Sequence, residues 1–211
     1  MTNAIDKLFQ TTARPADFAK GYLAHLGKIL GSLDVDAIAS FVDILLQARE
    51  SGNTVFFIGN GGSAATASHF ANDIAVGTRS TGKPFRAVSL TDNVAVMTAI
   101  ANDYGYDEIF LLQLKYQLRS GDVVVGISAS GNSPNVVKAI EFANENGALT
   151  VGLSGFDGGR LRQLVKTSLH VQTEKGEYGP VEDVHMVLDH LVGGFLMQVC
   201  RAETTTGVSR R

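Results

Sequence analysis

The sequence predicts a doubly wound α/β fold, in which helices cover both faces of a parallel sheet. Apolar runs of strand length alternate with helix-like segments between residues 54 and 171. The run 122–128 is almost wholly apolar, which is typical of a strand that is buried on both faces. Two of the runs end in glycine-containing turns, and ligands of such sheets bind beyond the carboxyl ends of the strands.

Helices are predicted before the first strand. Apolar residues between Pro15 and Arg49 recur at helical spacing, and the pattern breaks at residues 31–34. Two helices should therefore form, with Asp34 or Asp36 as the N-cap of the second. Neither helix can belong to a strand–helix–strand connection, so we expect the pair to pack on a sheet edge or to join a partner subunit.

Five strands and further helices are expected after residue 53. The strands are predicted at 55–58, 85–90, 122–128, 150–154 and 168–171, and the helices at 63–76, 94–101, 108–118, 136–147, 161–165 and 180–199. This alternation corresponds to a flavodoxin-like five-stranded parallel sheet with extra N-terminal helices. We expect one domain over residues 1–211, with its helical segment at about 15–50 and its α/β core at about 53–200.

The composition argues against several classes of protein. The net charge of −3 gives no electrostatic reason to expect a nucleic acid partner. Cys200 is the only cysteine, which rules out an internal disulfide and a cysteine-based zinc motif and favours a reducing compartment. No apolar run reaches the ~18 residues of a membrane span, and the N-terminus lacks the apolar segment of a secretory signal. We expect a cytoplasmic protein whose polar end, 202–211, is a frayed tail.

The turn after the first predicted strand suits an anionic ligand. Its residues are Gly59, Asn60, Gly61, Gly62 and Ser63. Glycine permits positive φ and close approach of a bound group, and the following helix would direct N–H groups and its positive dipole end at the same place. A phosphate or carboxylate would fit there, although turns between a strand and a helix are also glycine-rich for packing alone.

A second turn, after the strand at 122–128, is rich in hydroxyl groups. The polar residues around Gly131 are Ser128, Ser130, Asn132 and Ser133. Serine hydroxyls can donate to phosphate oxygens while a helix N-terminus supplies the positive field, so no lysine is needed. An ordinary serine N-cap is the alternative, but a cap needs one hydroxyl and this loop has three.

Four motifs together resemble the sugar isomerase (SIS) domain family, and within it the phosphoheptose isomerases. They are Gly59-Asn60-Gly61-Gly62-Ser63, His69-Phe70-Ala71, Ser128-Ala129-Ser130-Gly131-Asn132-Ser133 and Glu182-Asp183-Val184-His185. Phosphoheptose isomerases interconvert sedoheptulose 7-phosphate and glycero-manno-heptose 7-phosphate. The resemblance covers most of the chain, and the first two motifs narrow it to the phosphoheptose branch.

The resemblance implies roles for individual residues. The sugar phosphate and its neighbouring hydroxyls would be bound by Asn60, Gly61, Gly62, Ser63, Ser128, Ser130, Asn132 and Ser133. Asp92 and Asn93, after the second strand, are further candidates for sugar hydroxyls, although both could be turn or cap residues. The metal-binding or acid/base positions of the family fall on His69, Asp73, Glu182 and His190.

Helical spacing makes a metal site of these four residues plausible without the family. His69 and Asp73 are four residues apart on one helix, and Glu182 and His190 are two turns apart on another. Two imidazoles and two carboxylates suit Zn²⁺ or another divalent ion. A simple surface pair of His69 with Asp73 is the alternative. His185 and Asp189, on the last helix, could form a second-shell or surface pair.

Two positions depart from the family pattern. Asp73 is one methylene shorter than the family's glutamate, and Glu182 carries a charge where the family usually has glutamine. More negative charge should tighten the binding of a divalent cation. A shorter arm could displace a catalytic base by ~1 Å, which can cost ~10²-fold in rate. Ala129 also lacks a hydroxyl that many relatives have.

The function implied by the resemblance is aldose–ketose isomerisation through an enediol(ate). Asp73 and His190 are the acid/base candidates, and Glu182 or a metal-bound water could move the proton if those two bind the metal. Relatives form homotetramers with sites at subunit boundaries. One alternative is a non-catalytic SIS protein that binds a replication initiator. Residues 91–103 resemble such a protein, but it lacks a histidine at the position of His190. A sugar-phosphate sensor is a further alternative.

Overall fold

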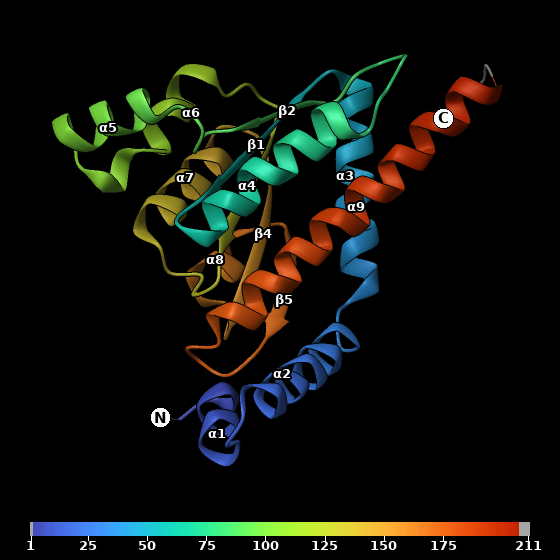
Figure 1. Cartoon of the computed structure of the whole chain (residues 1–211). Helices are drawn as coiled ribbons and strands as arrows, with labels where there is room; N and C mark the ends of the chain where they lie inside the picture. Colours follow the sequence, from blue (N-terminus) through green and yellow to red (C-terminus); the bar gives the residue numbers. More distant parts are fainter. Residues whose placement is uncertain (1, 207–211) are drawn as a thin grey trace.

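A five-stranded parallel sheet forms the centre of the computed structural model, which describes residues 2–206 and the side chains of residues 2–204 (Figure 1). The strands are β1 (Thr54–Gly59), β2 (Arg86–Ser89), β3 (Val123–Ser128), β4 (Leu149–Phe156) and β5 (Thr167–Gln172). Their order is β2-β1-β3-β4-β5, and all neighbours are parallel. The predicted doubly wound, flavodoxin-like sheet is therefore confirmed.

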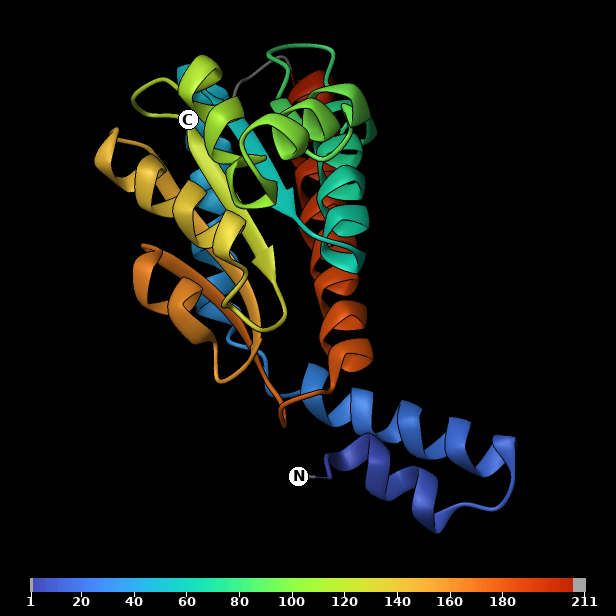
Figure 2. The same ribbon diagram turned by 90° about the vertical axis from the view of Figure 1, so that its left-hand side faces the viewer.

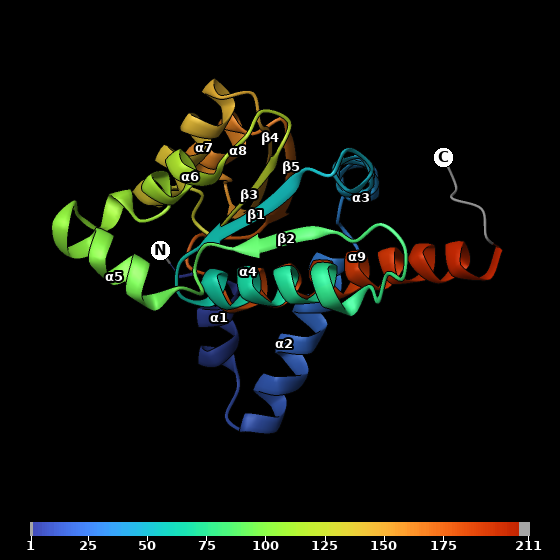
Figure 3. The ribbon, with the colours of Figure 1, turned by 90° about the horizontal axis from the view of Figure 1, so that it is seen from above.

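Helices cover both faces of the sheet (Figure 3). One layer contains α3 (Val35–Ser51), α4 (Gly62–Asn72) and α9 (Tyr178–Thr206), and the other contains α5 (Val94–Asp103), α6 (Leu111–Gln117), α7 (Pro134–Glu145) and α8 (Gly159–Leu164). Alternate side chains of β1 pack against the two helical layers, because successive residues of a strand point to opposite faces of the sheet. Val55 and Phe57 pack with the first layer, whereas Phe56 and Ile58 pack with the second.

Helix α3 corrects the expectation that the helices before β1 pack on a sheet edge. It lies on a face of the sheet, where the fully buried Phe41 and Leu45 join the same cluster as Phe57. The reason is the path of the chain. The connections from β3 to β4 and from β4 to β5 place α7 and α8 on the opposite layer, so α3 and α9 must cover β4 and β5 here. Asp34 is the predicted N-cap, accepting hydrogen bonds from the N–H groups of Asp36 and Ala37.

Helices α1 (Ala4–Thr11) and α2 (Pro15–Leu30) form an arm that projects away from the sheet (Figure 2). Helix α1 was not predicted, and it begins with a capping box between Asn3 and Asp6. The arm is tied to the start of α9, where the Tyr22 hydroxyl donates to Asp183 at 2.6 Å. The predicted break between the two following helices is confirmed at Gly31.

The last helix is longer than predicted. Helix α9 runs to Thr206, so residues 202–206 are helical instead of a frayed tail, and residues 207–211 lie outside the described part of the chain. Among the described residues, no helix is both long and apolar enough to cross a membrane.

The loop of residues 128–133 at the end of β3, called the serine loop below, needs a glycine at position 131. The φ of Gly131 is +64°, and a Cβ there would overlap the carbonyl oxygen of Gly158. We therefore expect Gly131→Ala to lower the free energy of unfolding by at least about 2 kcal/mol, measured by denaturant titration. Gly27→Ala is the matched control, because no atom lies within 4 Å of a Cβ at this helical position. It should be neutral or slightly stabilising, and equal losses in both variants would contradict this account.

Candidate active site

Two turns meet at the carboxyl edge of the sheet, because β1 and β3 are neighbours. Asn60, after β1, exchanges two hydrogen bonds of 2.9 Å with the buried amide of Asn135 on α7. The Tyr106 hydroxyl also donates to Asn60 Oδ1, at 3.0 Å. The amide of Asn60, which was predicted to bind substrate, thus joins one turn to the other.

The serine loop after β3 brings three hydroxyls together. Ser128 Oγ lies 3.1 Å from Ser133 Oγ and 3.5 Å from Ser130 Oγ. Ser133 occupies the N-cap position of α7, yet its side chain makes no capping hydrogen bond. The ordinary serine cap therefore does not explain this loop. Three clustered hydroxyls at a helix N-terminus are a suitable cradle for a phosphate group.

Asn132 shapes the serine loop and one wall of a neighbouring cavity. Its side chain donates to the carbonyl oxygen of Ser130 at 2.9 Å and accepts from the N–H of Arg160 at 3.1 Å. The cavity, of about 340 Å³, is also lined by Ser130, Gln172 and Lys175. The predicted phosphate cradle thus borders a space that can admit a ligand.

The turn after β1 leads directly into α4. Gly61 is the N-cap and provides no side-chain hydrogen bond to the first turn, and Ser63 is buried there. A Cβ at Gly62 would overlap the carboxylate of Glu182, so glycine lets this carboxylate lie against the start of α4. A helix N-terminus favours a negative charge. The pKa of Glu182 is raised, first by burial and then by the nearby Asp183.

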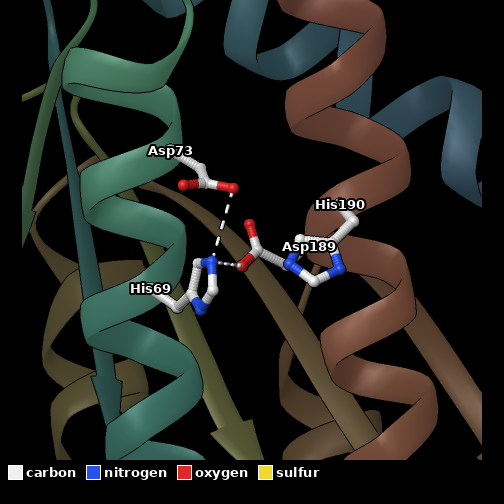
Figure 4. Close-up of side chains that lie close together, drawn as sticks. All are labelled: His69, Asp73, Asp189 and His190. Carbon is white, nitrogen blue, oxygen red and sulfur yellow. Dashed lines mark ion pairs between the residues drawn. The ribbon is translucent and has the colours of Figure 1, made fainter.

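A four-residue cluster is formed by His69, Asp73, Asp189 and His190 (Figure 4). His69 lies on α4, Asp73 begins the π-helical turn Asp73–Gly77 that continues α4, and the other two lie on α9. One possible ligand atom from each residue lies within 4.8 Å of the others. His69 Nε2 is 3.5 Å from Asp73 Oδ2 and 3.9 Å from Asp189 Oδ2, and the two imidazole rings are 5.0 Å apart. These residues are a possible metal-ligand set.

Helices α4 and α9 run side by side in the same direction, and this explains which residues form the cluster. Glu182 contacts Gly62 at the start of α4, and Gly193 faces Asp73 just after the end of α4. From Glu182 to Asp189 the helix rises by about 10 Å. The structure therefore brings together three of the four predicted ligands, His69, Asp73 and His190, and its fourth group is the carboxylate of Asp189 instead of Glu182.

Asp189 carries a buried carboxylate that accepts no hydrogen bond from the described residues. The residue is fully buried, and neither carboxylate oxygen has a hydrogen-bond partner among the described residues. Burial, and then the charge of Asp73, raise its pKa to about 7, while His190 opposes the shift. His185, one turn earlier, is also fully buried, and burial lowers its pKa to about 4. Their suggested surface pair is therefore wrong, because both residues are buried.

The raised pKa of Asp189 predicts a pH-dependent stability in the metal-free protein. The ordinary value is 3.8 and the folded value about 7, so the folded state binds the additional proton and loses stability as pH rises from about 4 to 7. Asp189→Asn removes this loss, and its stability advantage should grow to about 4 kcal/mol by pH 8. Denaturant titrations in a chelator measure it. Parallel pH curves for the two proteins would contradict the expectation.

Asp92 and Asn93 lie apart from the serine loop, beside the outer surface of α4. Asp92 accepts hydrogen bonds from the hydroxyls of Ser68 and Thr91. Asn93 accepts from the N–H of Val96 at 3.1 Å and caps α5. The capping alternative for Asn93 is therefore observed, and both residues border a surface hollow between α4 and β2.

Asp189 is the residue that sequence reasoning did not place in the site. A helical wheel could have identified Asp189. It follows Glu182 by seven residues, so the two side chains leave the helix axis in directions only ~20° apart. His190 follows by eight residues and points about 80° away. No comparable sequence signal identifies Asn135 and Tyr106, which join the turns through tertiary contacts.

Comparison with known proteins shows the family to which the chain belongs. The SIS domain family matches residues 21–155. A phosphoheptose isomerase from Geobacter metallireducens is 41% identical over 74% of this chain and 81% of its own length, and a probable phosphoheptose isomerase from Thermoplasma acidophilum is 37% identical over 82% and 94%.

Solved structures agree. The phosphoheptose isomerase from Neisseria gonorrhoeae superposes with a TM-score of 0.74 and 34% identity, covering 87% of this chain and 96% of its own. The chain belongs to the SIS domain family and, within it, to the phosphoheptose isomerases.

Proposed function

We propose that the protein is an aldose–ketose isomerase that interconverts sedoheptulose 7-phosphate and glycero-manno-heptose 7-phosphate. The observation that carries this proposal is that the serine loop and the glycine-rich turn lie at one end of α4 and the four-residue cluster lies at its other end. Helix α4 connects them, rising by about 9 Å from Ser63 to His69. Such a separation suits a substrate whose phosphate and carbonyl ends are several carbons apart.

The residues divide into a phosphate end and a reacting end. The hydroxyls of Ser128, Ser130 and Ser133 hold the phosphate, together with the N-termini of α4 and α7. Glu182 of α9, whose carboxylate lies against Gly62 at the start of α4, accepts hydrogen bonds from sugar hydroxyls between the two ends in this proposal. Its distance from the cluster makes this role more suitable than the expected ones of metal ligand or proton carrier.

Asp73 is the proposed base at the reacting end. Its side chain is 27% exposed and can reach a bound sugar, whereas the buried Asp189 cannot. Asp73 takes a proton from C1 of the ketose and, after exchange with solvent, delivers a proton to C2. The C1 hydroxyl loses its proton and the oxygen at C2 gains one, which gives the aldose. Asp73 Oδ2 lies 3.5 Å from His69 Nε2, so the proposed base stands beside the cluster's histidines.

The cluster fits a divalent metal ion, and we propose Zn²⁺. Two neutral imidazoles and two carboxylates balance a charge of +2, and the unpartnered carboxylate of Asp189 gains the partner that it lacks. His69 and His190 would be the nitrogen ligands. When bound, a metal ion supplies stabilisation of the negative enediolate oxygen.

Ser130→Ala tests the phosphate cradle. The variant should raise the KM for sedoheptulose 7-phosphate by about 10- to 100-fold, because one hydrogen bond to a charged group is lost. The kcat should change little, since Ser130 lies at the phosphate end. Steady-state kinetics measures both constants. An unchanged KM would remove Ser130 from the binding site.

We also propose that the protein is a homotetramer in the cytoplasm, with sites at subunit boundaries. An apolar groove between α3 and α9, lined partly by Leu191 and Phe195, supports a contact with another copy. Leu191 is 47% and Phe195 53% exposed. The buried free thiol of Cys200 suits a reducing compartment.

The proposed function is tested by incubating the purified, zinc-loaded protein with sedoheptulose 7-phosphate and following aldose formation. Turnover is expected, and a five- or six-carbon ketose phosphate is the control for chain length. Absence of turnover, with binding to a replication initiator, would instead favour the non-catalytic alternative.

A further inference from the structure

We propose that Asp189 is the carboxylate ligand of a metal site completed by His69 and His190, and that Asp73 is thereby free to act on the substrate. The inference rests on the proposed isomerase function. It assigns metal binding to one carboxylate of the four-residue cluster and proton transfer to the other. None of the four sequence motifs contains Asp189.

Burial separates the two carboxylates. Asp189 is fully buried, so no substrate atom can reach it, whereas Asp73 is partly exposed. A base in this reaction must touch the carbon-bound proton, but a metal ligand need not touch the substrate. Asp189 is therefore suited to bind an ion and Asp73 to move a proton.

The carboxylate of Asp189 lacks any partner except the neighbouring His69. Neither oxygen accepts a hydrogen bond among the described residues, although burial of an unpaired polar group is unfavourable. Asp189 points from α9 toward His69 on α4 (Figure 4), and its Oδ2 lies 3.9 Å from His69 Nε2. Ligand atoms around one tetrahedral Zn²⁺ are about 3.4 Å apart, so a small movement would suffice.

The composition of this ligand set is that of an open catalytic site. Two histidines and one carboxylate leave a fourth position for a substrate oxygen, as in zinc enzymes with three protein ligands. His190 is exposed and His69 partly exposed, so the open position faces accessible space. A set that also used Asp73 would leave no position for the substrate in a four-coordinate ion.

Zinc titration of the full-length protein without substrate tests the inference. Asp189→Asn should weaken Zn²⁺ binding by more than the 10- to 100-fold that loss of an outer-shell partner causes, and Asp189→Leu, which has no ligand atom, should do the same. Asp73→Asn is the matched carboxylate-to-amide control and should weaken binding by at most about 10-fold. Glu182→Gln should leave it unchanged.

The absorption spectrum of the Co²⁺-loaded protein gives a second readout. The d–d bands should change in Asp189→Asn and stay as in the parent protein in Asp73→Asn. Tight zinc binding and an unaltered spectrum in Asp189→Asn, or the larger loss in Asp73→Asn, would overturn the inference. Because these measurements use no substrate, zinc binding through Asp189 without turnover would contradict only the proposed function.

Discussion

Asp73→Asn should lower the kcat for sedoheptulose 7-phosphate by about 10²- to 10⁴-fold, the usual contribution of a general base. The amide has nearly the same shape as the carboxylate, so the fold and the phosphate cradle should persist. The variant cannot accept the proton from C1. We therefore expect KM to change by only a few-fold in steady-state kinetics, with zinc retained.

Asp73→Glu is the control for this prediction, because it restores the glutamate that the family pattern has at this position. The variant lengthens the side chain by one methylene without loss of the base, and it should keep more activity than Asp73→Asn. If the asparagine variant kept the parent kcat, Asp73 would not be the base.

His190→Ala should abolish both stoichiometric zinc binding and isomerisation. The imidazole lies in the four-residue cluster, 5.0 Å from the ring of His69, and its loss leaves one nitrogen ligand. We expect a fall in kcat/KM of at least about 10³-fold, because the metal ion that would stabilise the enediolate is no longer held. Elemental analysis and steady-state kinetics measure the two effects.

His25→Ala is the matched histidine control for His190→Ala. His25 lies on the N-terminal arm, where it is 3.1 Å from Glu177, remote from the four-residue cluster in sequence and contacts. The variant should keep its zinc and its kcat. Equal zinc content in His190→Ala and the parent protein would exclude His190 as a ligand.

The fold was predictable from the sequence because its signals are local. The apolar run at 122–128 became the fully buried strand β3, and the break near Gly31 and the cap at Asp34 were found where expected. The position of α3 could not be predicted, because it depends on which faces α7 and α8 leave uncovered. Helix α1 was missed because none of its residues is buried and its apolar stripe is short.

The candidate site was partly predictable for the same reason. Ser128, Ser130 and Ser133 lie in one loop, and His69 and Asp73 on one helical turn, so local spacing sufficed. Which residues of α9 lie beside which residues of α4 depends on how the two helices pack in the folded chain. This packing places Glu182 against Gly62 and brings Asp189 to His69, which the sequence could not specify.

Isomerisation of sedoheptulose 7-phosphate in D₂O, followed by NMR, tests the central claim most directly. A base that takes a proton from C1 and returns one to C2 should exchange it with solvent, so the aldose should carry deuterium at C2. The account predicts this product from the zinc-loaded parent protein and almost none from Asp73→Asn. No conversion by the zinc-loaded parent protein, or the same deuterated product at the parent rate from Asp73→Asn, would contradict proton transfer by this site.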